Sequence, residues 1–231
     1  MTTISVCIIA KNEEKHISDC IKSVLPVADE IILLDTGSTD KTIEIAESFD
    51  KVKVYQTEWE NDFSKARNQC ISYAKSDWIL CIDADEILQE YAQKNLKTYL
   101  ENHHLKDKAL VVKFLGEDYE PGLISQIYYK AGIFKNHKGI KFILPFHEYP
   151  VSPEEDLHIR HSSNCRVYHM QKTDTDTMRE RHIRDSKIMM DFLNKSENKK
   201  HESYYFRHLG DSYRSVGEDF GAIGFNFCLK F

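Results

Sequence analysis

The chain has 231 residues, of which 41% are apolar and 29% are charged, and its net charge is −6. That length can bury the core of one domain with an appendage, and the negative charge argues against a nucleic-acid-binding protein that depends on phosphate contacts. No apolar run reaches the length of a membrane span, and the N-terminus lacks the basic and apolar segments of a signal peptide. The six cysteines have no paired metal-ligand spacing, so we expect reduced thiols and a cytoplasmic location.

The first hundred residues alternate between apolar runs typical of buried strands and amphipathic patterns typical of helices. The predicted strands are 4–10, 30–35, 52–55 and 78–85, and the predicted helices are 17–25, 39–49, 63–74 and 88–100. Strands and helices that alternate at this spacing form right-handed crossovers. We therefore predict an α/β fold with a mostly parallel sheet flanked by helices.

After residue 109 the alternation of strand and helix stops. Four further stretches read as strands: 109–115, 127–134, 141–144 and 165–169. They predict a smaller mixed or antiparallel region beside the parallel half. From Thr175 onward apolar residues recur at helical spacing, which predicts a C-terminal helical segment.

Two carboxylates, Asp83 and Asp85, stand one residue apart at the end of the most apolar predicted strand. Because side chains alternate along a strand, both should point to the same side. Carboxylate oxygens at the carboxyl end of a buried strand suit Mg²⁺ or Mn²⁺ completed by the phosphates of a substrate. The alternative is that both residues merely begin a turn and cap the next helix.

Polar residues also end the first two predicted strands: Asn12 and Glu13 follow the first, and Asp35 ends the second. In open α/β sheets ligands bind at this edge. The chain has neither a glycine-rich dinucleotide fingerprint nor a P-loop. A phosphate ligand held mainly by a metal is the interpretation that remains.

Four motifs carry a resemblance to a known family. They are SVCIIAKNEE at 5–14, LDTGSTDKT at 34–42, NDFSKARN at 61–68 and DAD at 83–85. In order and spacing they resemble the family-2 glycosyltransferases of the GT-A (Rossmann-like) fold. Within that family the chain is most similar to the branch with a tetratricopeptide tail, which includes the sublancin S-glycosyltransferase, and also to bacterial lipopolysaccharide-core glucosyltransferases.

The resemblance implies a nucleotide-sugar donor of the UDP type. The implied donor-binding residues are Ile9, Ala10, Asn12, Glu13, Asp35, Arg67, Asn68 and Asp83. Asp35 would accept hydrogen bonds from the base, and Arg67 and Asn68 would lie over the base and diphosphate. Taken alone, Asp35 could equally begin a turn and Arg67 could lie on a solvated helix face.

The resemblance also implies a metal site and a catalytic base. Asp83, Asp85 and His169 would hold Mn²⁺ or Mg²⁺, which neutralises the departing diphosphate. For an inverting transfer the candidate general base is Glu148, with His147 beside it as orienting residue or second choice. The alternatives are an ordinary polar turn for the His–Glu pair and a structural role for His169.

We expect three parts: a nucleotide-sugar-binding half at 1–105, an acceptor-side region at 106–172, and a helical tail at 173–231. The tail carries five signature positions of a tetratricopeptide repeat, namely Phe206, Leu209, Gly210, Tyr213 and Ala222, whereas the next two, Asn226 and Leu229, do not fit. Because such repeats need neighbours to cover their apolar face, a homodimer through the tail is one expectation.

The sequence leaves the sugar and the acceptor open, and a peptide or a saccharide fits equally. Two other classes of function remain as alternatives. One is a non-catalytic tetratricopeptide-type binding module with a vestigial nucleotide-sugar pocket, and the other is a nucleotidyltransferase. The set of four motifs argues against the first, and the missing glycine- and lysine-rich first loop argues against the second.

Overall fold

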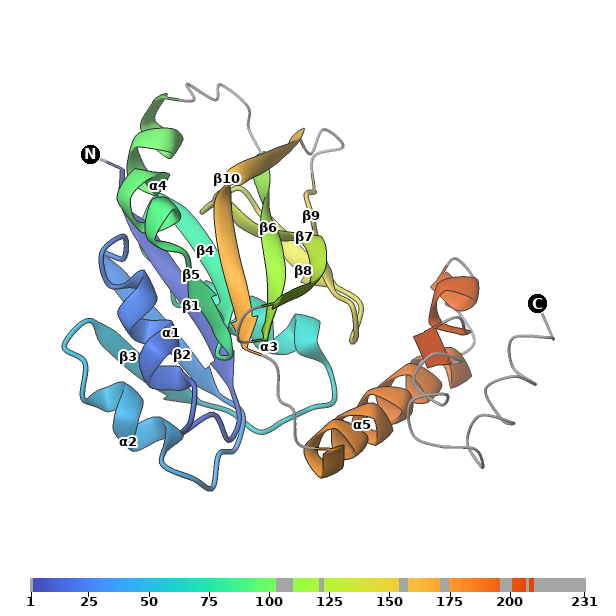
Figure 1. Cartoon of the computed structure of the whole chain (residues 1–231). Helices are drawn as coiled ribbons and strands as arrows, with labels where there is room; N and C mark the ends of the chain where they lie inside the picture. The colour runs from blue at the N-terminus through green and yellow to red at the C-terminus, as the bar shows by residue number, and fades with distance from the viewer. Residues whose placement is uncertain are drawn as a thin grey trace. The chain divides into compact units, whose positions relative to one another are not determined.

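The computed structural model describes residues 2–102, 110–120, 123–153, 158–170, 175–195, 201–206 and 208–209. Within these ranges the main feature is an eight-stranded sheet with the strand order β3-β2-β1-β4-β7-β6-β10-β5 (Figure 1). A separate two-stranded sheet pairs β8 with β9. The fold class predicted from the sequence is confirmed.

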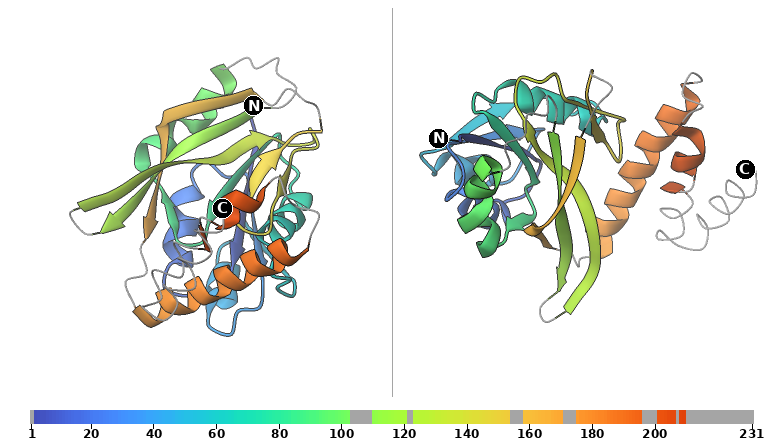
Figure 2. Two further views of the ribbon diagram at one scale, coloured as in Figure 1. Left: turned by 90° about the vertical axis from the view of Figure 1, so that its right-hand side faces the viewer. Right: turned by 90° about the horizontal axis from the view of Figure 1, so that it is seen from above.

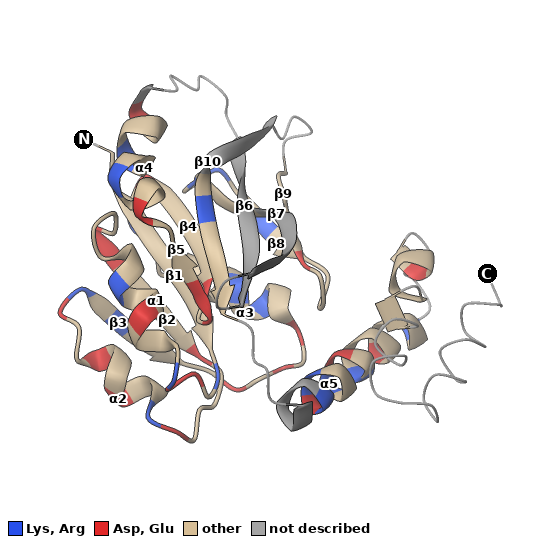
Figure 3. Cartoon of the chain, in the orientation of Figure 1, with Lys and Arg blue, Asp and Glu red and all other residues tan. Residues whose placement is uncertain are grey.

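Four parallel strands form the first half of the large sheet: β1 (Ile4–Ala10), β2 (Glu30–Asp35), β3 (Val52–Gln56) and β4 (Trp78–Asp83). The helices that connect them are α1 (Ile17–Val24), α2 (Thr42–Glu47) and α3 (Phe63–Ser72), and α4 (Glu90–Asn102) comes later in the chain, after β4. Charged residues lie mostly on helices and loops, and the central strands are nearly free of them (Figure 3). Such strands are buried on both faces, which is why their sequences read as continuous apolar runs.

Two apolar clusters lie on the two faces of this half. One joins the even-numbered residues of β1 with apolar residues of α1, α2 and α4, and the other joins Cys7 of β1 with Ala66 and Cys70 of α3. The alternation along β1 therefore assigns three helices to one face and α3 to the other. A hydrogen bond from Arg67 to Asp83 places this part of α3 beside the carboxyl end of β4.

The second half of the sheet is mixed, as predicted. It contains β6 (Leu110–Glu120), β7 (Leu123–Lys135), β10 (His158–Met170) and β5 (Glu86–Leu88). β7 runs antiparallel to both β4 and β6, whereas β10 runs parallel to β6 and antiparallel to β5. Figure 2 shows β6 and β7 as long, bent strands. The small sheet pairs β8 (Lys141–Ile143) with β9 (Tyr149–Val151).

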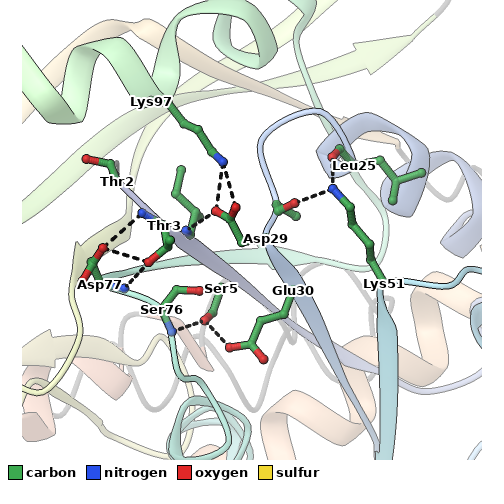
Figure 4. Close-up of polar contacts among 12 residues, drawn as sticks. Thr2, Thr3, Ser5, Leu25, Asp29, Glu30, Lys51, Ser76, Asp77 and Lys97 are labelled. Atoms are coloured by element: carbon green, nitrogen blue, oxygen red, sulfur yellow. Dashed lines mark hydrogen bonds and ion pairs between the residues drawn. The ribbon is translucent and has the colours of Figure 1, made fainter.

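A polar network fastens the amino ends of the parallel strands (Figure 4). Glu30 accepts hydrogen bonds from Ser5 Oγ and from the Lys75 main-chain N–H, both at 2.7 Å. Asp29 accepts from the Ile4 N–H at 2.8 Å and pairs with Lys97. All of these contacts join groups of the protein itself, so the polar network at this edge of the sheet stabilises the fold.

The chain divides into two compact units. The first comprises Met1–Glu60, Ser64–Ile143 and Glu148–Gln171, and the second comprises Asn61–Phe63, Leu144–His147 and Lys172–Phe231. The second contains α5 (Thr175–Asn194) and a buried Tyr205, whose hydroxyl donates to the Phe146 carbonyl at 2.7 Å. The division into three parts made from the sequence stays a prediction.

Of the tetratricopeptide positions, Phe206 and Leu209 are described, and Leu209 is buried. Gly210, Tyr213, Ala222, Asn226 and Leu229 lie outside the described residues. Across the helices that the structure describes, none combines the length and the apolar character needed to cross a membrane.

Candidate functional site

Two aspartates predicted from the sequence lie at the carboxyl ends of the parallel strands. In the strand register, Ala10 lies beside Asp35 of β2 and Ile9 lies beside Asp83 of β4. The two aspartates therefore flank the end of β1 from either side. This is the edge at which open α/β sheets bind ligands.

Asp35 uses its two carboxylate oxygens differently. Oδ1 accepts hydrogen bonds from the main-chain N–H groups of Gly37 and Ser38, each at 2.9 Å, and Gly37 has the positive φ of 103° that this turn requires. The residue is 2% exposed, and Oδ2 has no hydrogen-bond partner among the described residues. A buried acceptor without a donor is costly, so this oxygen is suited to a ligand that brings a donor.

The loop after β1 is tied to the loop after β2. The main-chain N–H of Thr39 donates to Asn12 Oδ1 at 2.8 Å, and the Asn12 N–H donates to Ser38 Oγ at 2.9 Å. Glu13 is buried, its N–H donates to Thr42 Oγ1, and its carboxylate lies 3.1 Å from His16 Nδ1. Asn12 thus holds the two loops together through its side chain and main chain, and Glu13 does so through its main chain.

The main chain at the end of β1 is also engaged. The Ala10 carbonyl accepts from the main-chain N–H of Thr36 at 2.9 Å, and Ala10 is buried whereas Ile9 is half-buried. In the register of β1 with β2, Ala10 lies beside Asp35 and Ile9 lies beside Leu34. Their role in a base pocket stays a prediction.

Arg67 of α3 joins two carboxylates of the predicted site. Its Nη2 donates to Asp83 Oδ1 at 2.7 Å, its Nε donates to Glu148 Oε1, and its guanidinium lies 5.6 Å from the centre of the Phe142 ring. Burial alone would lower the pKa of Arg67, but the charges of Asp83 and Glu148 outweigh it and raise that pKa well above its ordinary value. The arginine therefore stays charged and brings Asp83 and Glu148 together.

The side-chain amide of Asn68, the next residue on α3, forms hydrogen bonds with the main chain of another strand. Oδ1 accepts from the Phe142 main-chain N–H and Nδ2 donates to the Phe142 carbonyl, both at 2.8 Å. Phe142 lies in β8, which pairs with the strand that begins directly after Glu148. Neither Arg67 nor Asn68 is free of protein contacts, as a solvated helix face would have required.

The Asp83–Asp85 motif is a strand end followed by a turn. β4 ends at Asp83, so the predicted strand 78–85 is two residues too long, and strand alternation does not govern Asp85. Asp85 Oδ2 instead lies 3.3 Å from His169 Nε2, and the Asp85 carbonyl accepts from the Met170 N–H. The structure pairs Asp85 with His169 and Asp83 with Arg67.

Sequence reasoning missed Glu86. This residue is 1% exposed, and its carboxylate accepts from the Asp83 main-chain N–H at 2.8 Å, which fixes the turn between the two aspartates. In the register of β5 with β10 it lies opposite His169. Its position directly after Asp85 could have indicated this role, because a carboxylate there can accept a hydrogen bond from a main-chain N–H of the turn.

Asp85 and His169 offer an oxygen and an imidazole nitrogen, which is a donor set for Mn²⁺ or Mg²⁺ when diphosphate and water complete the coordination. Among the residues that the structure describes, no group of three or more histidines, cysteines or acids is arranged to hold a metal ion. The predicted set of Asp83, Asp85 and His169 thus fits a metal only with the help of substrate oxygens.

His147 belongs to the second unit, unlike Glu148. Its ring lies 4.1 Å from that of His208 and 4.2 Å from that of Phe146, measured between ring centres. Burial, followed by the neighbouring His208, lowers the pKa of His147 to about 4. Its backbone is left-handed, with φ of 52°.

A family model described as glycosyl transferase family 2 matches residues 5–165. The chain belongs to glycosyl transferase family 2. This assignment, predicted from the four motifs, is therefore confirmed.

Two curated relatives extend the comparison. A TPR repeat-containing protein of Synechococcus elongatus is 39% identical over 150 residues, covering 64% of this chain and 35% of the relative. The SPbeta prophage-derived glycosyltransferase SunS of Bacillus subtilis is 34% identical over 168 residues, covering 72% of this chain and 39% of the relative. The match thus spans less than two fifths of either relative.

Among solved structures, residues 1–349 of Staphylococcus aureus TarS in complex with UDP superpose with a TM-score of 0.55 at 16% identity, covering 99% of this chain and 88% of that one. The same region in complex with UDP-GlcNAc gives the same TM-score. At this identity the likeness establishes the fold.

Proposed function

We propose that this chain is the catalytic part of a glycosyltransferase that moves a sugar from a UDP-sugar to an acceptor nucleophile. The observation that carries the proposal is the buried, unpaired Oδ2 of Asp35 at the ligand-binding edge of a family-2 sheet. An N–H group of a nucleobase is the kind of donor that this oxygen lacks. The complexes of TarS with UDP and UDP-GlcNAc support a uridine nucleotide as the base-bearing part.

The diphosphate would lie across the end of β1, between Asp35 and the turn that follows β4. Asp85 and His169 would there hold Mn²⁺ or Mg²⁺, which supplies Lewis-acid stabilisation of the departing diphosphate. Glu86 would keep the turn in place through the Asp83 main chain. Ile9, Ala10, Asn12 and Glu13 would line or support the base pocket.

Glu148 would serve as the general base. Arg67 Nε holds its carboxylate in place, and a carboxylate positioned beside an acceptor can take its proton. As the acceptor oxygen or sulfur attacks the anomeric carbon, its proton passes to Glu148 and the bond from that carbon to the diphosphate breaks. A single displacement of this kind inverts the anomeric centre. His147 remains the second choice for this role.

The acceptor would be a peptide or a saccharide, bound by the region 106–172, with the tail at 173–231 as a further interaction module. A cytoplasmic location and a homodimer through the tail remain predictions.

Release of UDP tests the reaction. The purified chain is incubated with UDP-glucose or UDP-N-acetylglucosamine and Mn²⁺, with water as acceptor, beside the Glu148→Gln variant. The glutamine still accepts from Arg67 but cannot take a proton, so we expect turnover to fall by about 10²-fold while UDP binding is retained. Unchanged turnover would remove Glu148 from the role of base. A folded wild-type chain that turns over neither donor would contradict the proposed reaction and favour a binding module.

A further inference from the structure

The side chain of Asn68 forms its hydrogen bonds with the main chain of the protein itself. Both of its hydrogen bonds go to one residue, Phe142, at 2.8 Å each, and the amide thereby pairs with β8 as the main chain of a neighbouring strand would. Only one orientation of the amide satisfies both bonds, because oxygen accepts and nitrogen donates. The side chain is therefore fixed in place as well as occupied.

The strand pair that Asn68 holds is weak by itself. β8 and β9 have three residues each, and Phe142 lies opposite Pro150, which has no N–H to donate. In a strand the N–H and C=O of one residue point to the same side, so those of Phe142 point toward α3 and away from Pro150. A two-stranded ribbon of this size is marginal alone, and Asn68 supplies the pairing that its outer edge lacks.

Glu148 directly precedes β9. The first residue of that strand, Tyr149, pairs with Ile143 of β8. Arg67 binds the carboxylate of Glu148, and Asn68 binds the strand beside it. Two consecutive residues of α3 thus fix the same hairpin, one at its functional side chain and the other at its main chain. The helix in turn packs on the sheet through Ala66 and Cys70.

We propose that Asn68 is a positioning residue for Glu148 and that it does not bind the nucleotide. This inference rests on the proposed function, in which Glu148 is the general base. A base that is displaced by about an ångström loses much of its rate advantage, whereas the donor site at Asp35 is untouched. The two roles of Asn68 therefore predict opposite kinetic effects.

The test compares Asn68→Ala with Gln69→Ala in the full chain. Gln69 is the matched control, because it is the next residue on α3, is also half-buried, and donates to the Tyr73 hydroxyl of its own helical region instead of to the hairpin. For Asn68→Ala we expect kcat of UDP-sugar hydrolysis to fall about tenfold or more, with KM and the UDP dissociation constant within about twofold of the wild type. Gln69→Ala should leave all three values unchanged.

Amide hydrogen exchange across residues 141–151, measured without nucleotide, provides a second readout. We expect faster exchange in Asn68→Ala than in the wild type and no change in Gln69→Ala. If the alanine variant does not fold, Asn68→Asp carries the same test, because its carboxylate still accepts from Phe142 but cannot donate.

A tenfold weaker UDP complex with kcat retained would overturn the inference and return Asn68 to the nucleotide site. Unchanged exchange of the hairpin would overturn it as well, whatever the activity. A wild-type chain that binds no UDP would instead contradict the proposed donor, and the exchange experiment would still show whether Asn68 holds the hairpin.

Discussion

At the scale of single residues, carboxylates have different surroundings at the two edges of the sheet. Glu30 at the amino edge has both carboxylate oxygens engaged with Ser5, Lys75 and Lys53. Asp35 at the carboxyl edge engages one oxygen in a turn and leaves the other buried without a partner. Glu30 therefore has a structural role, whereas the buried, unpaired oxygen of Asp35 indicates a place for a ligand.

His147 gives the chain a pH-dependent stability. Its pKa of about 4 in the fold lies below the ordinary value, so the folded chain resists protonation more than the unfolded chain does. The stabilisation is complete above about pH 6.5 and is lost as the pH falls from there toward 4. In urea unfolding, the wild type should lose more stability between pH 7 and pH 5 than His147→Asn, in which asparagine tolerates the left-handed backbone.

His137→Asn is the matched control for that measurement. His137 also has a left-handed backbone, with φ of 59°, but it is exposed. His137→Asn shows the effect of replacing an exposed histidine that has a left-handed backbone. Any additional effect of His147→Asn then comes from the burial of His147. If the free energy of unfolding depends on pH equally in the wild type and in His147→Asn, the lowered pKa of His147 is refuted as its cause.

The sequence predicted the residues of the candidate site but not their contacts. Asp35 and the Arg67-Asn68 pair were predicted from motifs that stand at expected places relative to strands. That Arg67 pairs with Glu148, 81 residues away, depends on how the β8–β9 hairpin packs on α3, which no local pattern encodes. Glu86 is a different case, because its partner is the Asp83 main-chain N–H only three residues away, a local contact that its place after Asp85 could have indicated.

At the scale of elements, the parallel half was predictable, whereas the mixed half was predicted only in part, since 165–169 covers part of β10, and β5 and β9 were missed. Apolar runs gave β1, β2 and β4 with little error, because burial on both faces leaves a clear signal. β5 and β9 have three residues each, and β9 contains Pro150, so propensity argued against them. Tertiary pairing alone makes them strands.

Glu30 links elements, and its effect should depend on pH. Burial raises its pKa, but hydrogen bonds from Ser5 and Lys75 and the charge of Lys53 outweigh this and leave the pKa below its ordinary value. Its stabilisation is therefore present above about pH 4.5 and is lost as the pH falls through the lower folded value. Glu30→Gln should reduce the free energy of unfolding by about 1 kcal/mol at pH 7 and by less at pH 3.

Glu44→Gln on α2 is the control for Glu30→Gln, because Glu44 is exposed. Its effect on the free energy of unfolding should stay within about 0.5 kcal/mol at either pH. A Glu30→Gln penalty that is the same at pH 3 and pH 7 would contradict the role given to its charge.

At the scale of the whole molecule, the sheet separates stability from function. The amino edge is closed by internal polar contacts (Figure 4), whereas the carboxyl edge gathers Asp35, Asp83, Arg67 and Glu148 within one unit. The family assignment covers most of this unit, since the family model matches residues 5–165. The central claim is that this edge binds a uridine nucleotide through Asp35.

Calorimetric titration with UDP in the presence of Mn²⁺, on the wild type and on Asp35→Asn, tests that claim most directly. Asparagine keeps the oxygen that accepts from Gly37 and Ser38 but replaces the unpaired acceptor with a donor. Affinity should therefore fall at least about tenfold, while Glu30→Gln at the opposite edge retains it. Equal UDP affinity in the wild type and Asp35→Asn, or no UDP binding by the folded wild type, would contradict the account.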